Sequence, residues 1–463
     1  MNYLAAKIKK NKHILIIVFL FFVIKIFSLP AYRTVWWDSA VYIGMGKYVY
    51  SLGNSGFWEA SRPLVWPLIL GFFHKTGFGI AAAGRIIEII FGSLCIFTTY
   101  FIGKKSFDES TALIAAIFLA LSPTFFFFNG IMLTEIVSTF FSLAALSFFM
   151  KDKYFASGIF FGIAFMSRFL QLFALAGLVI IILAYRNKIK IKNILQIASG
   201  FVLVVLPFLI FNQIAYGNFL FPFARQLFLS ASSGWSNYHG ISYYFAGLFR
   251  ENFLYILSAA GVFLCIKSKD KKKTAMASIF FLMFLFFNSI NQKEMRFLII
   301  LLPYMYLLAA YPLSVFIKKY AGNFKQIAYS LIIVSLVFSA WFIVDLYSSE
   351  SQKQNQYQIF QDRLSMQSSG SIWISNPIIA VSSNLKISKL MYYEIFSISK
   401  KNELIKDSEN AGIILVDSCD LACRPSDYGC ESAKAGLIAY FKQNFKTEYS
   451  NSISGCSQFI FEK

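Results

Sequence analysis

Residues 14–29 read ILIIVFLFFVIKIFSL, and residues 36–42, which follow after a short connection, read WWDSAVY. The first stretch is almost entirely apolar and approaches the roughly 20 residues that a helix needs to cross a bilayer. It lacks a small-residue cleavage site, so we expect a retained transmembrane helix and not a signal peptide. The aromatic and acidic residues after it are then expected at the membrane surface, where Trp is favoured.

The composition of the chain indicates that lipid is its solvent. Of its 463 residues, 57% are hydrophobic and only 14% are charged, whereas a typical soluble domain has about 25% charged residues. The net charge of +20 resides in short basic clusters between apolar runs. Such clusters orient helices in a membrane. We therefore predict a polytopic α-helical membrane protein with no nucleic-acid partner.

Eleven apolar stretches are candidate transmembrane helices. They are residues 13–30, 80–103, 110–128, 131–150, 154–168, 169–185, 194–216, 250–267, 274–290, 295–317 and 324–347. Residues 154–185 form one apolar run that is too long for a single helix, and Arg168 in its middle is costly in lipid. Two short helices that meet at Arg168, at the outer surface, resolve both problems.

The distribution of basic residues predicts the orientation of these helices. If the N-terminus is cytoplasmic, the six inner segments hold 20 Lys and Arg in about 47 residues, a much higher density than in the outer segments. The prediction is a transmembrane domain over residues 1–347 with an outer loop at 31–79, and an extracytoplasmic domain over 348–463. The inner connections are short and carry no glycine-rich phosphate loop. If the protein uses an activated donor substrate, that donor must then bind from the outer side or from within the membrane.

The outer loop begins with Asp38 beside Trp36 and Trp37. The following residues have the periodicity of a helix that ends at Gly53 and could lie along the membrane. A carboxylate at a partly dry interface can act as a general base. The alternative is that Asp38 caps the N-terminus of this helix, a role that is compatible with the first.

The order of residues in this loop resembles the first outer loop of the C-type glycosyltransferases. The resemblance is carried by Asp38, Ala40, Tyr42, a helix that ends at Gly53, and then Arg62-Pro63. These families include the protein O-mannosyltransferases and the aminoarabinose transferases that act on lipid A. The resemblance implies that Asp38 is the catalytic base or helps to hold a metal. Tyr42, Glu59 and Arg62 of this loop are candidates for substrate binding. A divalent cation is left open, because Ser39 stands where these families usually have a second acid.

Two charged residues interrupt the apolar runs near the predicted outer face. Glu135 opens the fourth helix, and an ionisable residue in a membrane span is a functional candidate. The resemblance favours a catalytic role, because the same families carry a second acidic motif here. Stabilisation of the helix N-terminus, with Thr134 as its cap, is the alternative. Arg168 can bind a phosphate or pair with Glu135 as a structural bridge.

Residues 291–297, NQKEMRF, place two cations and one anion at the start of a helix. Lys293 and Arg296 lie three positions apart and could bind one phosphate. Interface anchoring with a Lys/Glu surface pair is the alternative. The run resembles the His-Lys-Glu-x-Arg-Phe motif of dolichyl-phosphate-mannose-dependent mannosyltransferases, with Glu294, Phe297 and Pro303 at matching positions and Gln292 or Asn291 in place of the family His.

Loop 217–249 is rich in aromatic residues and contains His239. Aromatic faces can stack on sugar rings, which makes His239 a candidate for substrate binding. A membrane-interface aromatic belt explains the same residues.

The polar C-terminal residues suggest a small α/β domain that can bury its own core. We predict strands at 372–374, 378–381 and 412–416 and a helix at 431–441. The four cysteines here are Cys419, Cys423, Cys430 and Cys456. Outside the membrane they are expected to form two disulfides, with three possible connectivities. An all-thiolate zinc site is the alternative.

The predicted function is an inverting glycosyltransferase at the outer membrane face. Its donor is a polyprenyl- or dolichyl-phosphate sugar, with mannose favoured, and its acceptor is a hydroxyl of a glycan, lipid or protein. The alternatives are a flippase or transporter of lipid-linked oligosaccharide, or a polysaccharide polymerase. A transporter should have charges near the midplane. Lys25 is the candidate for such a charge, but it lies close enough to the outer end of its helix to snorkel.

Overall fold

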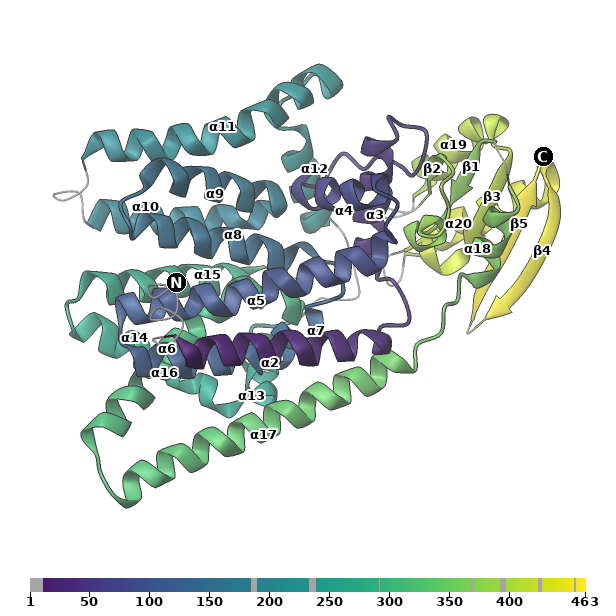
Figure 1. Ribbon diagram of the computed structural model, residues 1–463. Coiled ribbons are helices and arrows are strands. Elements are labelled where there is room, and N and C mark those ends of the chain that lie inside the picture. The colour runs from purple at the N-terminus through teal and green to yellow at the C-terminus, as the bar shows by residue number, and fades with distance from the viewer. Residues whose placement is uncertain are drawn as a thin grey trace. The chain divides into compact units, whose positions relative to one another are not determined.

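The structure is a computed structural model that describes residues 11–184, 190–232, 239–290, 292–367, 370–391, 397–423, 427–453 and 455–463. The chain divides into two compact units (Figure 1). The helical unit comprises the described residues of Met1–Tyr32, Arg85–Phe219 and His239–Gln352. The mixed unit comprises those of Arg33–Gly84, Leu220–Tyr238 and Lys353–Lys463.

The helical unit is built mostly from apolar helices of different lengths. They are α2 (Lys12–Ser28), most of α5 (Ile80–Ser106), α6 (Glu109–Ala120), α7 (Pro123–Phe128), α8 (Thr134–Phe149), α9 (Tyr154–Ser167), α10 (Leu172–Ala184), α11 (Ile191–Tyr216), α13 (Ser242–Glu251), α14 (Leu257–Lys267), α15 (Lys271–Ser289), α16 (Leu302–Lys319) and α17 (Asn323–Ser351). Short 3-10 turns are η1 (Leu29–Ala31), η2 (Phe169–Gln171), η3 (Phe253–Ile256) and η4 (Met295–Ile300).

Helical segments lie in all eleven predicted stretches. Within the described residues, four helices are long and apolar enough to cross a membrane: Lys12–Ala31, Ile80–Ser106, Ile191–Tyr216 and Asn323–Ser351. The number of crossings stays a prediction. Two breaks follow from local chemistry. Arg168 is extended between α9 and η2, and Ser122 caps α7 with Pro123 at its first position, which separates α7 from α6.

Small residues allow close contact of helix backbones in this unit. A Cβ added to Gly158 of α9 would lie 2.1 Å from the carbonyl oxygen of Ile197 in α11. A Cβ added to Gly200 of α11 would lie 2.3 Å from the carbonyl oxygen of Phe155. The two helices thus meet backbone to backbone, as small residues permit in membrane helix pairs.

The mixed unit is organised around a five-stranded sheet of order β2-β1-β3-β5-β4. Its elements are α3 (Trp37–Tyr50), α4 (Val65–Lys75), α12 (Phe221–Ser232), α18 (Gln358–Ser365), β1 (Ile372–Ile374), η5 (Pro377–Ala380), β2 (Ile387–Leu390), α19 (Ile398–Asp407), η6 (Ser408–Asn410), β3 (Ile413–Asp417), η7 (Ser418–Asp420), α20 (Tyr428–Asn444), β4 (Lys446–Ile453) and β5 (Cys456–Glu462). Strand β1 pairs in parallel with β2 and β3, whereas β5 pairs antiparallel with β3 and β4.

Alternate residues of the central strands face two separate cores. Ile414, Val416 and Phe461 pack with Leu404 of α19 and Leu437 of α20. On the other face, Ile372, Ile374, Ile413, Leu415 and Ile460 pack with Phe360 and Leu364 of α18 and with Val41, Met45 and Phe57 of the predicted outer loop. The loop therefore completes the second core of the sheet.

One prediction about the elements of this unit is wrong. Residues 378–381 are not a strand, because Pro377 and the Asn376 side chain, which accepts the Ile378 N–H, start the 3-10 turn η5. That α3 lies along the membrane stays a prediction, and all its residues from Ser39 to Lys47 are buried within the protein. In the structure the loop belongs to the same compact unit as residues 353–463. The domain limits at 347 and 348 otherwise stay a prediction.

The predicted pair of disulfides is confirmed. Cys419 is bonded to Cys456 with an S–S distance of 2.05 Å, and Cys423 is bonded to Cys430. The zinc alternative is wrong, since all four sulfurs are used. Cys95 and Cys265 are buried thiols in α5 and α14.

We expect Gly158→Val to lower the melting temperature of the detergent-solubilised protein. The added methyl groups would overlap the Ile197 carbonyl, and overpacking of this kind costs about 1–3 kcal/mol or more. Gly79→Val is the control, because a Cβ at Gly79 meets nothing within 4 Å. Equal melting temperatures for the two variants would contradict the close contact of α9 and α11.

Asp420 should make the mixed unit sensitive to pH. Burial raises the pKa of Asp420 from about 3.8 to about 6, although Ser375, Asn376 and Tyr357 donate hydrogen bonds to it. Between pH 4 and 6 the folded state holds the proton and the unfolded state does not, so stability falls by about 3 kcal/mol as pH rises through this window.

Melting curves at pH 4 and pH 7 check this expectation with Asp420→Asn. The variant should resemble the wild type at pH 4 and become relatively more stable at pH 7. Asp362→Asn, at an exposed position of α18, should show no such trend. A difference between Asp420→Asn and the wild type that does not change with pH would contradict the raised pKa.

Candidate functional site

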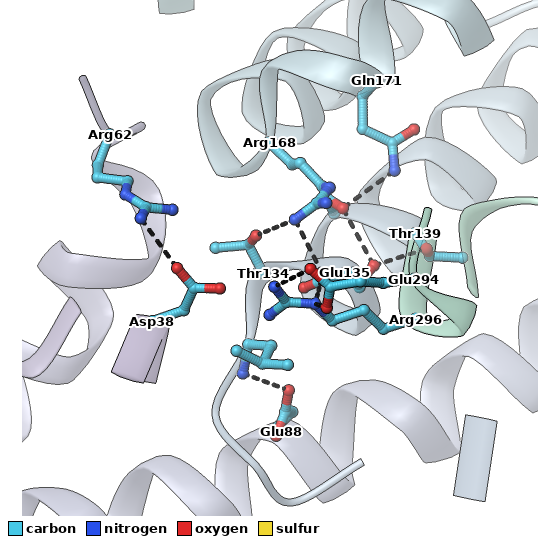
Figure 2. A network of polar contacts seen from close by, with 12 residues as sticks. Asp38, Arg62, Glu88, Thr134, Glu135, Thr139, Arg168, Gln171, Glu294 and Arg296 are labelled. Carbon is cyan, nitrogen blue, oxygen red and sulfur yellow. Dashed lines mark hydrogen bonds and ion pairs between the residues drawn. The ribbon is translucent and has the colours of Figure 1, made fainter. Parts of the chain in front are cut away.

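A buried carboxylate at the start of α8 gathers two arginines in the helical unit. Glu135 is 1% exposed, and its Oε1 lies 3.0 Å from Arg168 Nη1 and 3.7 Å from Arg296 Nε. Arg168 comes from the break between α9 and η2, and Arg296 comes from η4 (Figure 2). Three segments that are distant in sequence thus converge on one acidic side chain.

The two guanidinium groups are held by several other contacts. Arg168 Nη1 donates to the hydroxyl of Thr134 at 3.1 Å. Arg296 forms a two-point pair with Glu294, with Nε 2.6 Å from Oε2 and Nη2 3.2 Å from Oε1. Both arginines also lie over the ring of Phe297, at 5.3 and 5.6 Å from its centroid. Two cations and two anions therefore balance in a mostly buried cluster.

This cluster has the chemistry of an anion site that is neutral when empty. Guanidinium groups bind the oxygens of phosphates and carboxylates as planar forks. Here Glu135 and Glu294 supply those oxygens. A phosphate could replace Glu294, whose side chain is 21% exposed, at Arg296 without leaving a buried charge unpaired.

Lys293 and His239 lie close together in sequence-distant segments. Lys293 is 2% exposed, and its Nζ donates to the carbonyl oxygens of Ile290 and, at 3.1 Å, of His239. It thereby binds the end of α15 to residue 239. The ring of His239 is exposed and stacks on Tyr243 with centroids 4.1 Å apart. Residues 293–296 do not share one helix, because η4 begins only at Met295.

The mixed unit contains a second charged group, at the start of α3. Asp38 Oδ1 lies 2.9 Å from Arg62 Nη2, and Arg62 Nε lies 2.9 Å from Glu59 Oε1 (Figure 2 shows the first pair). The Arg62 guanidinium also lies over the rings of Trp37 and Tyr42, at 5.6 and 5.7 Å. Two carboxylates thus share one guanidinium.

Asp38 is not the N-cap of α3. The cap position is Trp36, and Asp38 lies in the first helical turn. Its side chain is 16% exposed and points to Arg62. The predicted capping position is therefore wrong, and Asp38 is instead an acidic residue of the first turn, where a negative charge is favourable. A partly exposed carboxylate with a fixed orientation suits a general base.

The segment that carries Asp38 is tied to the sheet of the same unit. Lys47 Nζ donates to the carbonyl oxygens of Val381 and Ser383 at 2.6 and 2.8 Å. Gly56 exchanges backbone hydrogen bonds with Leu385 and Ile387, both at 2.9 Å. Burial lowers the pKa of Lys47 to about 8. Asp38, Glu59 and Arg62 are thus presented by a loop that is anchored in the mixed unit.

Two buried charges of the helical unit were missed or misjudged from the sequence. Glu88 in α5 is fully buried and accepts three backbone hydrogen bonds from residues 130–133. The signal that could have found it is an acidic residue inside an apolar span. Lys25 does not snorkel: it is fully buried and donates to Phe126 and Tyr32.

Comparison with known proteins bears on the fold. Residues 61–211 match the family model described as dolichyl-phosphate-mannose-protein mannosyltransferase. A search of curated protein sequences returns no match. The structure of ArnT from Cupriavidus metallidurans bound to undecaprenyl phosphate has a TM-score of 0.68 at 11% identity, covering 97% of this chain and 98% of that chain. The archaeal oligosaccharyltransferase AglB from Archaeoglobus fulgidus, in complex with an inhibitory peptide and a dolichol-phosphate, has a TM-score of 0.66 at 13% identity and covers 98% of this chain and 74% of that chain.

Lys47→Met should loosen the loop that carries Asp38. The substitution leaves the carbonyls of Val381 and Ser383 without their donor, at a cost of about 1–3 kcal/mol. Hydrogen exchange measured by mass spectrometry should then be faster in residues 39–58 and 380–387. Lys75→Met, at an exposed position of α4, is the control. Unchanged exchange in Lys47→Met would argue that the other contacts suffice to hold the loop.

Proposed function

Since the chain has the fold of the C-type glycosyltransferases, we propose that it transfers a sugar from a polyprenyl or dolichyl phosphate to an acceptor hydroxyl, with inversion at the anomeric carbon. The observation that carries this proposal is the convergence of Arg168 and Arg296 on Glu135 in the helical unit. In a chain of this fold, a paired arginine site suits the phosphate of a lipid-linked donor.

The proposed orientation follows the distribution of basic residues. The chain crosses the membrane about eleven times, its N-terminus is cytoplasmic, and residues 348–463 are extracytoplasmic. The two disulfides support this orientation, because disulfides persist in oxidising compartments. The protein is then an integral component of the cell membrane that works at its outer face.

The lipid donor is proposed from the neighbouring structures and from the arginine cluster. The ArnT structure was determined with undecaprenyl phosphate and the AglB structure with a dolichol-phosphate. In this chain, Arg168 and Arg296 bind the donor phosphate as it replaces Glu294 at the two-point pair with Arg296. Glu135 stays between the arginines and fixes their direction, and Lys293 adds a nearby positive charge.

Asp38 is the proposed base. Its carboxylate takes the proton of the acceptor hydroxyl while the hydroxyl oxygen attacks the anomeric carbon from the side opposite the phosphate. The bond from that carbon to the phosphate oxygen breaks, and the lipid phosphate leaves with its charge stabilised by the arginines. Glu59 and the buried ring of Tyr42 hold Arg62 beside Asp38. The exposed ring of His239 supplies an aromatic face for sugar.

Mannose is the favoured sugar because of the Lys-Glu-x-Arg-Phe run and the matched family model. The acceptor is a glycan, a lipid or a protein. No step of the proposal passes through a metal. Asp38 and Glu59 share the cation Arg62, so this pair does not fit a divalent ion in the conformation described here.

The proposal is tested by transfer of radiolabelled mannose from dolichyl phosphate mannose into a membrane extract. We expect transfer by the wild type and a loss of about 100-fold or more in Asp38→Asn, because a general base contributes about 10²–10⁴-fold. Arg296→Gln should raise the KM for the donor. Asp362→Asn, an exposed acidic residue of the same unit, is the matched control and should behave like the wild type.

Other results point elsewhere. Full transfer by a folded Asp38→Asn variant would remove Asp38 from the mechanism and direct attention to Glu135 or Glu59. The absence of transfer from every polyprenyl-phosphate sugar tested would overturn the proposed transferase function. Flipping of lipid-linked oligosaccharide in reconstituted vesicles would then be the next function to measure.

A further inference from the structure

Glu88 and Lys25 hold the backbone segment that leads into Glu135 from two sides. We propose that Glu88 is a positioning residue: its carboxylate binds the N–H groups of Gly130, Met132 and Leu133 and so fixes the place of Glu135 between Arg168 and Arg296. The kinetic part of this inference rests on the proposed transferase function.

Glu88 binds three N–H groups of the segment. Oε2 of Glu88 accepts from the N–H groups of Gly130 and Met132 at 2.8 and 2.6 Å, and Oε1 accepts from the N–H of Leu133 at 2.9 Å. Glu88 is fully buried. A carboxylate can accept several such bonds at once, and hydrogen bonds to a charged acceptor are the strong ones.

The carbonyl side of the same segment is bound by groups near the end of α2. Lys25 Nζ donates to the carbonyl of Phe126 at 2.9 Å. The Tyr32 hydroxyl donates to the carbonyl of Phe127 and lies 3.4 Å from that of Asn129. Residues 126–133 are therefore held by the Lys25 amino group and the Tyr32 hydroxyl at their carbonyls and by the Glu88 carboxyl group at three of their N–H groups. We call these residues the strap.

The conformation of the strap needs this support. Gly130 has a φ of 111° and Met132 a φ of 71°. The second value is unusual for a residue with a side chain and persists only where the surroundings impose it. Met132 is completely buried, and its own N–H is one of the three bound by Glu88. Loss of the carboxylate would remove three of the hydrogen bonds that hold this turn in its shape.

The strap ends where the arginine cluster begins. Leu133, the last residue bound by Glu88, is the N-cap of α8, and its side chain makes no capping hydrogen bond. Thr134 and Glu135 follow at once, and both contact Arg168 Nη1. Figure 2 shows Glu88 beside the backbone that runs into Thr134. A shift of the strap must therefore move Glu135 relative to its arginines.

A general structural role for Glu88 makes a different prediction. If Glu88 only satisfies buried N–H groups, its loss lowers stability, and any effect on turnover is independent of Glu135. If Glu88 acts through Glu135, its loss has no further effect once the Glu135 carboxylate has been removed. A double-mutant cycle separates these two cases.

The experiment measures kcat/KM for sugar transfer in Glu88→Gln, Glu135→Gln and the double variant. We expect Glu88→Gln to lose about 10- to 100-fold, since small displacements of a site can cost that much. The double variant should match Glu135→Gln within about twofold. Glu88→Asp keeps the charge and should retain more activity than Glu88→Gln. Transfer at the wild-type rate by Glu88→Gln, or losses that multiply in the double variant, would overturn the inference.

A second measurement does not depend on activity. Hydrogen exchange of residues 129–135 should be faster in Glu88→Gln than in the wild type. If Glu88→Gln does not fold, Glu88→Asp takes its place in both measurements. The control is Asp108→Asn, whose carboxylate caps α6 by accepting the N–H of Thr111 at 2.9 Å, beyond the far end of α5. It should leave this peptide unchanged.

The two measurements distinguish the failure of this inference from the failure of the proposed function. If the wild type transfers no sugar, the function fails, and faster exchange in Glu88→Gln alone decides whether the carboxylate holds the strap. If the wild type transfers sugar and exchange is unchanged in Glu88→Gln, the positioning role fails and the transferase stands.

Discussion

The helical unit depends on the pairing of charges that cannot reach water. Glu135 is 1% exposed, and an unpaired carboxylate in such a place would cost several kcal/mol. Arg168 and Arg296 meet this requirement from two other segments. The same pairing fixes where the break after α9 and the turn η4 must lie, because each has to deliver its arginine to one carboxylate. The position of the charged cluster therefore depends on how these helices pack, and the packing in turn must satisfy the charges.

Backbone groups follow the same rule. Where the chain leaves helical geometry between α7 and α8, its N–H and carbonyl groups lose their helical partners in a region without solvent. Lys25, Tyr32 and Glu88 replace those partners. These polar side chains therefore serve the main chain, which explains why a lysine and a glutamate are both fully buried here.

Several features of the fold and of the charged cluster could be predicted from the sequence, and the predictions that failed did so for physical reasons. Glu135 and Arg168 stand out because each interrupts an apolar run, and the C-type glycosyltransferase resemblance is confirmed at the level of the fold. Glu88 gives the same signal, but its partners are backbone groups, which have no sequence signature. The burial of α3 was visible in its apolar residues. Its partner was not, because periodicity identifies a face that must be covered and says nothing of a sheet formed more than 300 residues later.

That pairing has a consequence for biosynthesis. Val41, Met45 and Phe57 complete a core with Ile460 of β5, the last strand of the chain. During synthesis the loop emerges early and must wait for nearly the whole polypeptide before its apolar residues are covered. Contacts of such high sequence separation form slowly and leave exposed surface that favours aggregation. The nascent loop is thus a natural client for a chaperone on its own side of the membrane, and a chain shortened at its C-terminus would leave it uncovered permanently.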